Sequence, residues 1–167
     1  MTRMTRVRFH HGLLALAAAV LVAGCATVDV ERALEITDVR TGWYDEGIVL
    51  GQNKLVPSIS LRLRNASETD VQSIQLNAIF HRVIEAEEPP LGDHFILAID
   101  REGLAPAATS EPLVLRSGFG YTGQQARLEM LQNRFFVDAR VEIYGKSGSR
   151  PWTLMGEFPI ERTLLTE

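Results

Sequence analysis

The chain has 167 residues, with 17 basic and 21 acidic side chains and a net charge of −4 at pH 7. This length corresponds to one ordinary domain, and the excess of acid argues against nucleic acid or an anionic lipid surface as a partner. The single cysteine excludes a disulfide within the chain, and four histidines leave a small inventory for metal binding or acid–base catalysis.

The first 24 residues have the profile of an export signal. Arg3, Arg6 and Arg8 form a basic leader without an acidic residue, and an uncharged apolar run from 13 to 22 follows. This run is well short of the roughly 20 residues that a helix needs to cross a bilayer. We therefore expect residues 1–24 to be removed, which leaves 14 basic and 21 acidic side chains in the mature protein.

The segment Leu21-Val22-Ala23-Gly24-Cys25 resembles the lipobox of bacterial lipoprotein precursors. In that class, the cysteine thiol takes a diacylglycerol group, the chain is cut before the cysteine, and the new amino group is acylated. A thiolate is the nucleophile that this chemistry needs, and several acyl chains hold a protein firmly on a membrane. The resemblance implies a palmitate-type lipid anchor on Cys25, and Ala26 implies the outer membrane, with the domain facing the periplasm. The alternative is a free cysteine after an ordinary secretory signal.

Residues 25–33 show no periodicity and predict a tether, and residues 34–167 predict a single β-rich domain. A first strand is expected over 34–39, ending near Gly42, with turns at 43–47 and 51–54. Trp43 and Tyr44 lie in the first of these turns and are candidate partner-binding residues, because surface loops carry much of protein function. The alternative is that they fold back and close one end of the domain.

Two strands with strict alternation follow. Ile59, Leu61 and Leu63 alternate with polar residues, and the same pattern recurs from Ile74 to Phe80. The turn residues at 65–70 between them predict a hairpin. His81 falls on the polar side of the second strand and is interpreted as a solvated histidine.

The second half of the chain is also strand-rich. A proline pair predicts a loop at 85–90, and further strands are expected at 91–99, 113–115, 137–143 and 152–160. The closing strand is predicted from Trp152, Leu154, Gly156, Phe158 and Ile160, which lie at alternate positions. Together these patterns predict a mainly β protein, an antiparallel immunoglobulin-like sandwich of about seven strands with one short helix near 124–132.

The stretch from Gly118 to Gly123 spells G-x-G-x-x-G, the pattern of a dinucleotide-binding turn. Such a turn belongs to repeated βαβ units, whereas this chain has the pattern of successive hairpins. We therefore predict no cofactor and interpret the stretch as a connection between two strands. Phe119 and Tyr121 then either cover the edge of the core or present an aromatic surface to a partner.

The segment Ser60-Leu61-Arg62-Leu63-Arg64-Asn65-Ala66-Ser67 and the later Gly103-Leu104-Ala105-Pro106-Ala107-Ala108-Thr109 are similar to FxLYD-type domains of bacterial envelope proteins. Those domains are immunoglobulin-like sandwiches with an "N-x-S" turn and an "L-x-P-G-x-T" strand entry. The match covers roughly Leu55 to Leu115. Ala107 replaces the usual glycine, and residues 79–82 depart from the aromatic-Asp turn. The resemblance implies a sandwich and supplies no catalytic residue.

No G-x-S-x-G or H-E-x-x-H motif occurs, and the acidic run before Pro89 lacks the alternating oxygen ligands of a calcium loop. We expect no catalytic residue, metal or cofactor. The sequence favours a lipid-anchored, non-catalytic envelope lipoprotein that acts as a protein-interaction or scaffold module, with an envelope protein of unknown identity as its partner. The alternative is a periplasmic carrier or sensor that holds a small apolar ligand between its sheets.

Overall fold

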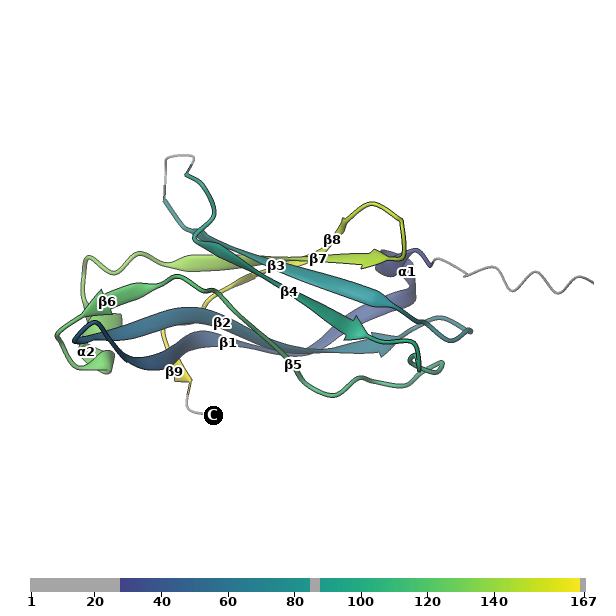
Figure 1. Ribbon diagram of the computed structural model, residues 1–167, viewed down its shortest axis with the longest axis horizontal. Coiled ribbons are helices and arrows are strands. Elements are labelled where there is room, and N and C mark those ends of the chain that lie inside the picture. Colours follow the sequence, from purple (N-terminus) through teal and green to yellow (C-terminus); the bar gives the residue numbers. More distant parts are fainter. Residues whose placement is uncertain (1–27, 85–87, 166–167) are drawn as a thin grey trace, which may run out of the picture.

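The computed structural model describes residues 28–84 and 88–165. Its elements in chain order are α1 (Val30–Ala33), β1 (Leu34–Val49), β2 (Gln52–Asn65), β3 (Ile74–Arg82), β4 (Gly92–Ile99), β5 (Leu113–Arg116), β6 (Tyr121–Gly123), α2 (Arg127–Gln132), β7 (Ala139–Ser147), β8 (Thr153–Pro159) and β9 (Leu164–Leu165). Two sheets face each other (Figure 1). One has the order β5-β2-β1-β9, with β6 also paired to β2, and the other has the order β4-β3-β7-β8. The predicted mainly β, antiparallel sandwich is confirmed, and α2 falls within the predicted helix at 124–132.

The longest pairing in the molecule joins β1 and β2, from Leu34 opposite Asn65 to Val49 opposite Gln52. The 16 residues of β1 extend over roughly 50 Å at about 3.3 Å per residue. The β1–β2 turn therefore lies at the opposite end of the sandwich from α1 (Figure 1), and we call this the distal end. The predicted strand end near Gly42 and turn at 43–47 are wrong. A bulge between Asp45 and Gly47 lets β1 continue through them.

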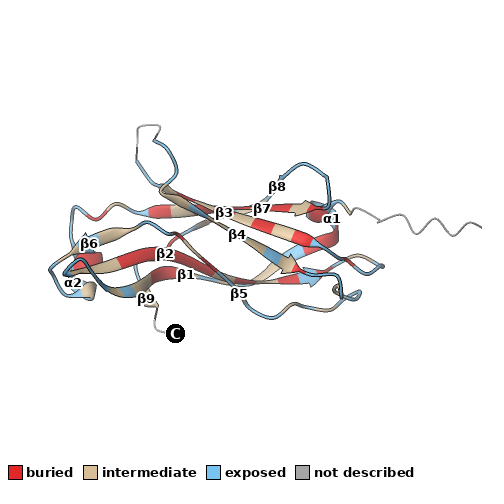
Figure 2. Ribbon diagram, in the orientation of Figure 1, coloured by how far each residue is buried: buried red, intermediate tan, exposed pale blue. Residues whose placement is uncertain are grey.

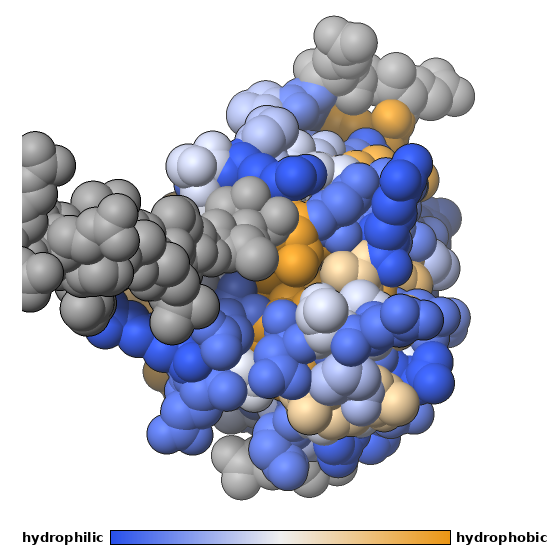
Figure 3. All heavy atoms as spheres, turned by 90° about the vertical axis from the view of Figure 1, so that its right-hand side faces the viewer, coloured by the Kyte–Doolittle hydropathy of each residue, from blue (hydrophilic) through white to orange (hydrophobic). Residues whose placement is uncertain are grey.

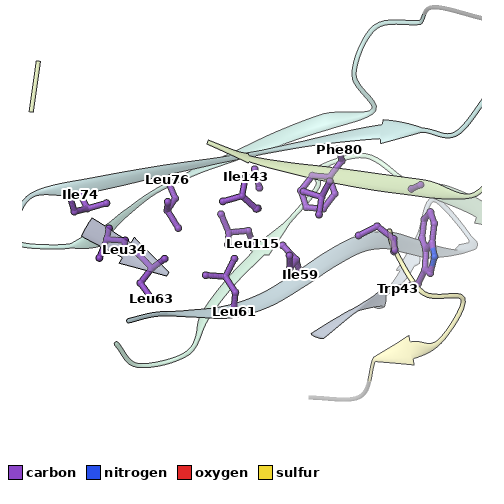
Figure 4. Packing of buried hydrophobic residues seen from close by; sticks show 14 of the residues in the cluster. Leu34, Trp43, Ile59, Leu61, Leu63, Ile74, Leu76, Phe80, Leu115 and Ile143 are labelled. Carbon is purple, nitrogen blue, oxygen red and sulfur yellow. The ribbon is translucent and has the colours of Figure 1, made fainter. Parts of the chain in front are cut away.

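The core lies between the sheets, where the alternating strands predicted from the sequence meet (Figure 4). The completely buried side chains of β2 and β3 include Ile59, Leu61, Leu63, Ile74, Leu76 and Phe80. Figure 2 shows the buried segments on β2, β3 and β7. The predicted hairpin between these two strands is wrong, because β2 and β3 belong to opposite sheets. Each strand has one apolar face, and facing each other across the core buries both.

The segment predicted as a tether already belongs to the domain from residue 28. Val30 and Ala33 lie on one side of α1 and are buried in the core, and the Val28 backbone N–H donates to the Ser147 hydroxyl over 3.2 Å. The reason is the i, i+3 spacing of two apolar residues on one helical turn. The folded domain therefore starts three residues after Cys25. Cys25 itself and the signal peptide predicted at 1–24 lie outside the described residues.

An extra residue, Met155, interrupts the pairing of β8 with β7. On one side of this bulge Phe158 packs against the core. On the other side Trp152 and Leu154 are turned outward and exposed. The closing strand is present as β8, and the bulge reverses the alternation of its first half without a sign in the hydrophobic pattern.

The glycine-rich stretch belongs to the five-stranded sheet, and the chain crosses to the other sheet after it. Both β5 and β6 pair antiparallel with β2, and the chain then passes through α2 to β7 in the other sheet. A β-carbon at Gly120 would overlap the backbone carbonyl of Leu55, so this glycine allows β6 to approach β2 closely. The interpretation as a connection between strands is confirmed for residues 118–120, whereas Tyr121–Gly123 form a short strand of their own, and Gly120 serves backbone packing.

Asn65 holds together the two segments that carry the FxLYD resemblance. The side chain is completely buried, and its Nδ2 donates to the Thr69 and Leu104 carbonyls, each over 2.8 Å. Its Oδ1 accepts a hydrogen bond from the Ser67 backbone N–H over 2.9 Å. A buried amide with all of these partners satisfied fixes the turn at 65–69 against the loop that enters β5.

The loop that enters β5 contains a turn with unfavourable residue chemistry. The Ala108 N–H donates to the Ala105 carbonyl over 3.1 Å, and Ala107 has φ 62°. Proline followed by a residue with positive φ is a type II turn, in which glycine normally holds the third position. Ala107 therefore occupies a left-handed conformation that disfavours a β-carbon.

We predict that Ala107→Gly raises the free energy of unfolding by about 1 kcal/mol, because it relieves the left-handed strain of alanine. Urea denaturation followed by circular dichroism measures this. Ala105→Gly is the matched control, because Ala105 is also exposed but lies at a position without positive φ, and glycine there adds freedom to the unfolded chain. A destabilised Ala107→Gly would contradict the turn assignment.

Candidate functional site at the distal end

Three segments that are distant in sequence meet at the distal end: the β1–β2 turn, β6 and α2 (Figure 1). An ion pair between Asp45 and Arg127 joins β1 to the start of α2. The Asn53 side-chain amide donates to the Gln125 carbonyl over 2.8 Å and joins β2 to the segment before α2. These contacts give the end of the sandwich a fixed shape.

Leu50 lies at the tip of this end, and its side chain buries no surface in the fold. It is 100% exposed and has φ 51°, followed by Gly51 with φ 78°. Two central residues with positive φ form a type I′ turn, which favours asparagine or glycine at the first position. A bulky leucine there is a backbone outlier, and such outliers are starting points for a hypothesis of function.

Further apolar side chains are exposed at the same end. They are Ile48 in β1, Leu128 in α2 and Phe135 after α2, of which Phe135 is 75% exposed. Phe135 also borders a hollow of about 140 Å³ that lies between β6 and α2. We call Ile48, Leu50, Leu128 and Phe135 the distal surface. Clustered apolar side chains on a protein surface mark interaction sites more often than single ones do.

An aromatic cluster supports the distal surface from below. The ring of Trp43 lies 4.6 Å from Phe136 and 5.4 Å from Tyr121, between ring centroids, and Tyr121 and Phe136 are 4.7 Å apart. Trp43 is completely buried at one end of the row of core side chains in Figure 4. Its indole N–H has no hydrogen-bond partner among the described residues. The Tyr121 hydroxyl donates to the Val137 carbonyl over 3.2 Å, and burial raises its pKa.

The four aromatic residues singled out in the sequence do not form one surface. Trp43 is part of the core, which is the alternative stated for it, and Tyr121 covers the edge of the core beside it. Tyr44 points to the outer face of the five-stranded sheet, where the Arg116 guanidinium lies 3.4 Å above the ring. Phe119 is largely exposed, close to Gly92 at the start of β4. Of the four, Phe119 is the one free to contact a partner with most of its surface.

Sequence reasoning missed Leu50 and Phe135. One signal was present: Leu-Gly at the centre of a two-residue turn, where Asn-Gly is the common choice. It could be recognised only with the register of β1 and β2 known, because the expected turn at 51–54 excludes Leu50. Phe135 carries no comparable signal, since its exposure depends on how the segment after α2 packs.

A cluster of charged groups occupies the outer face of the four-stranded sheet. The Glu142 carboxylate accepts hydrogen bonds from Arg140 and from the Tyr144 hydroxyl over 3.0 Å, and His81 Nε2 lies 3.5 Å from it. Burial acts to raise the pKa of Glu142, but these bonds outweigh it, and the pKa lies below its ordinary value. His81 is therefore half-buried beside a carboxylate rather than simply solvated. The cluster consists of mutually paired groups, as in a structural network.

Among residues 28–84 and 88–165, no three His, Cys, Asp or Glu side chains are grouped as ligands for a metal ion. In the same part of the chain, no helix has the length and apolar character needed to cross a membrane.

Comparison with known proteins does not assign the chain to a family. No family model and no curated protein matches the chain. Among solved structures, the chain is similar to a Northeast Structural Genomics Consortium target, SoR45, determined by X-ray crystallography. The two are 10% identical, with a TM-score of 0.43, and the match covers 79% of this chain and 89% of that one.

We predict that Leu50→Asn raises the free energy of unfolding by about 1 kcal/mol, because asparagine tolerates the left-handed region and loses no buried contact. Chemical denaturation measures the change. Gly51→Ala in the same turn is the control and should lower the free energy of unfolding by a similar amount, since it introduces a β-carbon at positive φ into open space. Equal stability of Leu50→Asn and the wild type would show that the leucine is not strained.

Proposed function

We propose that this chain is a lipid-anchored, non-catalytic lipoprotein of the cell envelope whose β-sandwich binds another envelope protein through its distal end. The resemblance of residues 21–25 to a lipobox supports the anchor, which we place on the outer membrane with the domain facing the periplasm. The resemblance to FxLYD-type domains, which supply no catalytic residue, supports an interaction module. The exposed apolar side chains at the distal end support the partner surface.

The geometry of the domain fits a lipid on Cys25. Two residues separate Cys25 from Val28, where the described fold begins, and the three steps from Cα to Cα span at most about 11 Å. The end of the sandwich that carries α1 is thus held at the membrane. The β1–β2 turn lies roughly 50 Å further along the strands, so the distal end is presented away from the lipid.

The exposure and backbone conformation of Leu50 are the main support for the partner site. A fully exposed leucine in a left-handed conformation costs stability twice, through the backbone and through apolar surface left in water. Covering such a side chain in an interface contributes about 1.5–3 kcal/mol. Phe135 and Ile48 are also exposed at this end, which carries the Asp45–Arg127 and Glu46–Lys54 ion pairs as well.

The same structure favours binding of a protein over the carriage of a small apolar ligand. At the distal end this holds by volume, because the hollow there has about 140 Å³, whereas pockets for small ligands have roughly 300–1,000 Å³; hollows of about 390 and 380 Å³ lie elsewhere, beside β9 and beside β4. Between the sheets, the described side chains of β2, β3 and β7 pack against one another with almost no exposed surface. Exposed apolar side chains above a packed aromatic cluster suit contact with a protein surface.

Replacement of Cys25 tests the anchor. We predict that Cys25→Ala moves the protein from the membrane to the soluble fraction after expression in a bacterium, because the lipid has no other attachment point. Fractionation with immunoblotting measures the distribution of wild type and variant. Equal membrane retention of both would contradict lipid anchoring at this residue.

Replacement of Leu50 tests the partner surface. We predict that Leu50→Asp lowers cross-linked recovery of a partner from native membranes at least about tenfold, as the loss of a central apolar contact does. Val114→Asp is the matched control, because Val114 is an exposed apolar residue on β5, outside the distal surface. Recovery of the same partner by wild type and Leu50→Asp would assign the interaction to another surface.

A further inference from the structure

The outer face of the four-stranded sheet divides into two halves of different chemistry. The half nearer to α1 exposes four apolar side chains, each between 40% and 57% accessible: Phe95 and Leu97 in β4, and Trp152 and Leu154 at the start of β8. We call these four residues the aromatic face. The half nearer to the distal end carries the charged cluster of His81, Arg140, Glu142 and Glu157.

The aromatic face is continuous across the sheet. Phe95 lies in β4 and Trp152 directly precedes β8, and these strands are the two edges of the sheet, yet the two ring centroids lie 6.1 Å apart at an angle of 85°. The rings therefore extend toward each other over β3 and β7. The Lys146 ammonium lies 5.4 Å from the Trp152 ring, which places a cation beside an apolar surface.

The Met155 bulge creates this face. Without the extra residue, Trp152 and Leu154 would share the inward side of β8 with Phe158, as the alternation predicts. Bulges re-aim side chains at functional positions, and here the bulge moves a tryptophan and a leucine from the core to the surface. The loss of buried area is a cost to the fold that an external contact would offset.

The aromatic face lies next to the start of the domain. Val28 donates its N–H to Ser147 at the end of β7, and the two ends of the β7–β8 loop border a hollow together with residues 28–31. Trp152 is adjacent in sequence to two residues that line this hollow, Pro151 and Thr153. A lipid on Cys25, three residues before Val28, would bring this corner of the sandwich to the bilayer surface.

We propose that the aromatic face rests on the bilayer to which Cys25 is attached, with Trp152 at the level of the lipid headgroups. This inference rests on the proposed lipid anchor. Tryptophan favours the membrane interface because its ring is apolar and its N–H is polar. Attachment through Cys25 makes the contact intramolecular, so that a weak apolar contact is sufficient.

The charge of the domain sets its tilt. The excess of acid gives no attraction to an anionic surface, so the contact is apolar and independent of acidic lipids. Glu142 and Glu157 keep the other half of the sheet hydrated, because charged groups avoid an apolar environment. The α1 end itself is largely hydrophilic, with a narrow apolar band at its middle (Figure 3). The domain therefore leans on its aromatic face and keeps the distal end in water.

Quenching of tryptophan fluorescence by brominated lipids tests the contact, since the chain has two tryptophans and Trp43 is buried. The natively lipidated protein is reconstituted in phosphatidylcholine vesicles with and without bromine on the acyl chains near the headgroup. We expect bromine to reduce wild-type emission by roughly half, because one of two indoles lies at the interface. Trp152→Phe is expected to abolish this quenching, whereas Phe95→Ser with Leu97→Ser should weaken it.

Two other results would overturn the inference. Emission unaffected by bromine would show that Trp152 stays in water, and a detergent-free dimer that Leu97→Ser dissociates in sedimentation would assign the face to a second copy of the chain. Failure of the anchor is distinguished by a second arm, in which the single thiol at Cys25 is coupled to a maleimide lipid. Absence of quenching in this arm contradicts the docking alone, whatever the native modification of Cys25.

Discussion

The pairing of β1 with β2 is the constraint on which the rest of this structure depends. It runs from Leu34 opposite Asn65 to Val49 opposite Gln52 and sets the length of the sandwich. One end therefore receives the incoming chain at α1, and the other carries the β1–β2 turn. The proposed partner site depends on this separation, because an anchor and an interaction surface need to lie apart if both are to be used at once.

Each end of the long hairpin is fixed by a different kind of interaction. At the α1 end, the buried Asn65 amide connects two loops through hydrogen bonds to Thr69 and Leu104. At the distal end, Trp43, Tyr121 and Phe136 stack beneath the surface. The hydrogen bonds of Asn65 fix the relative orientation of the two loops, and the aromatic cluster stabilises the distal end by burying apolar area. With both ends rigid, exposed apolar side chains such as Leu50 hold a defined position.

The sequence was informative where alternation is regular and uninformative where it is interrupted. A period of two correctly predicts the inward faces of β2 and β3. The hairpin pattern around the glycine-rich stretch correctly argued against a dinucleotide-binding turn in a βαβ unit. The bulge at Met155 turns Trp152 outward, against the alternation of β8. The hairpin expected between β2 and β3 is wrong, because the hydrophobic pattern does not show which sheet each strand joins. Leu50 was missed for a related reason, since strain at a turn is visible only when φ is known. Bulges, sheet assignment and turn geometry are tertiary properties that a hydrophobic pattern does not encode.

The proposed function depends most on a lipid at Cys25 that holds one end of the domain at the membrane. Mass spectrometry of the N-terminal peptide of the protein purified from bacterial membranes tests it most directly. We predict a mature chain that begins at Cys25, with a diacylglyceryl group on the cysteine sulfur and an acyl group on the cysteine amine. A chain that begins elsewhere, or an unmodified Cys25 thiol, would contradict it.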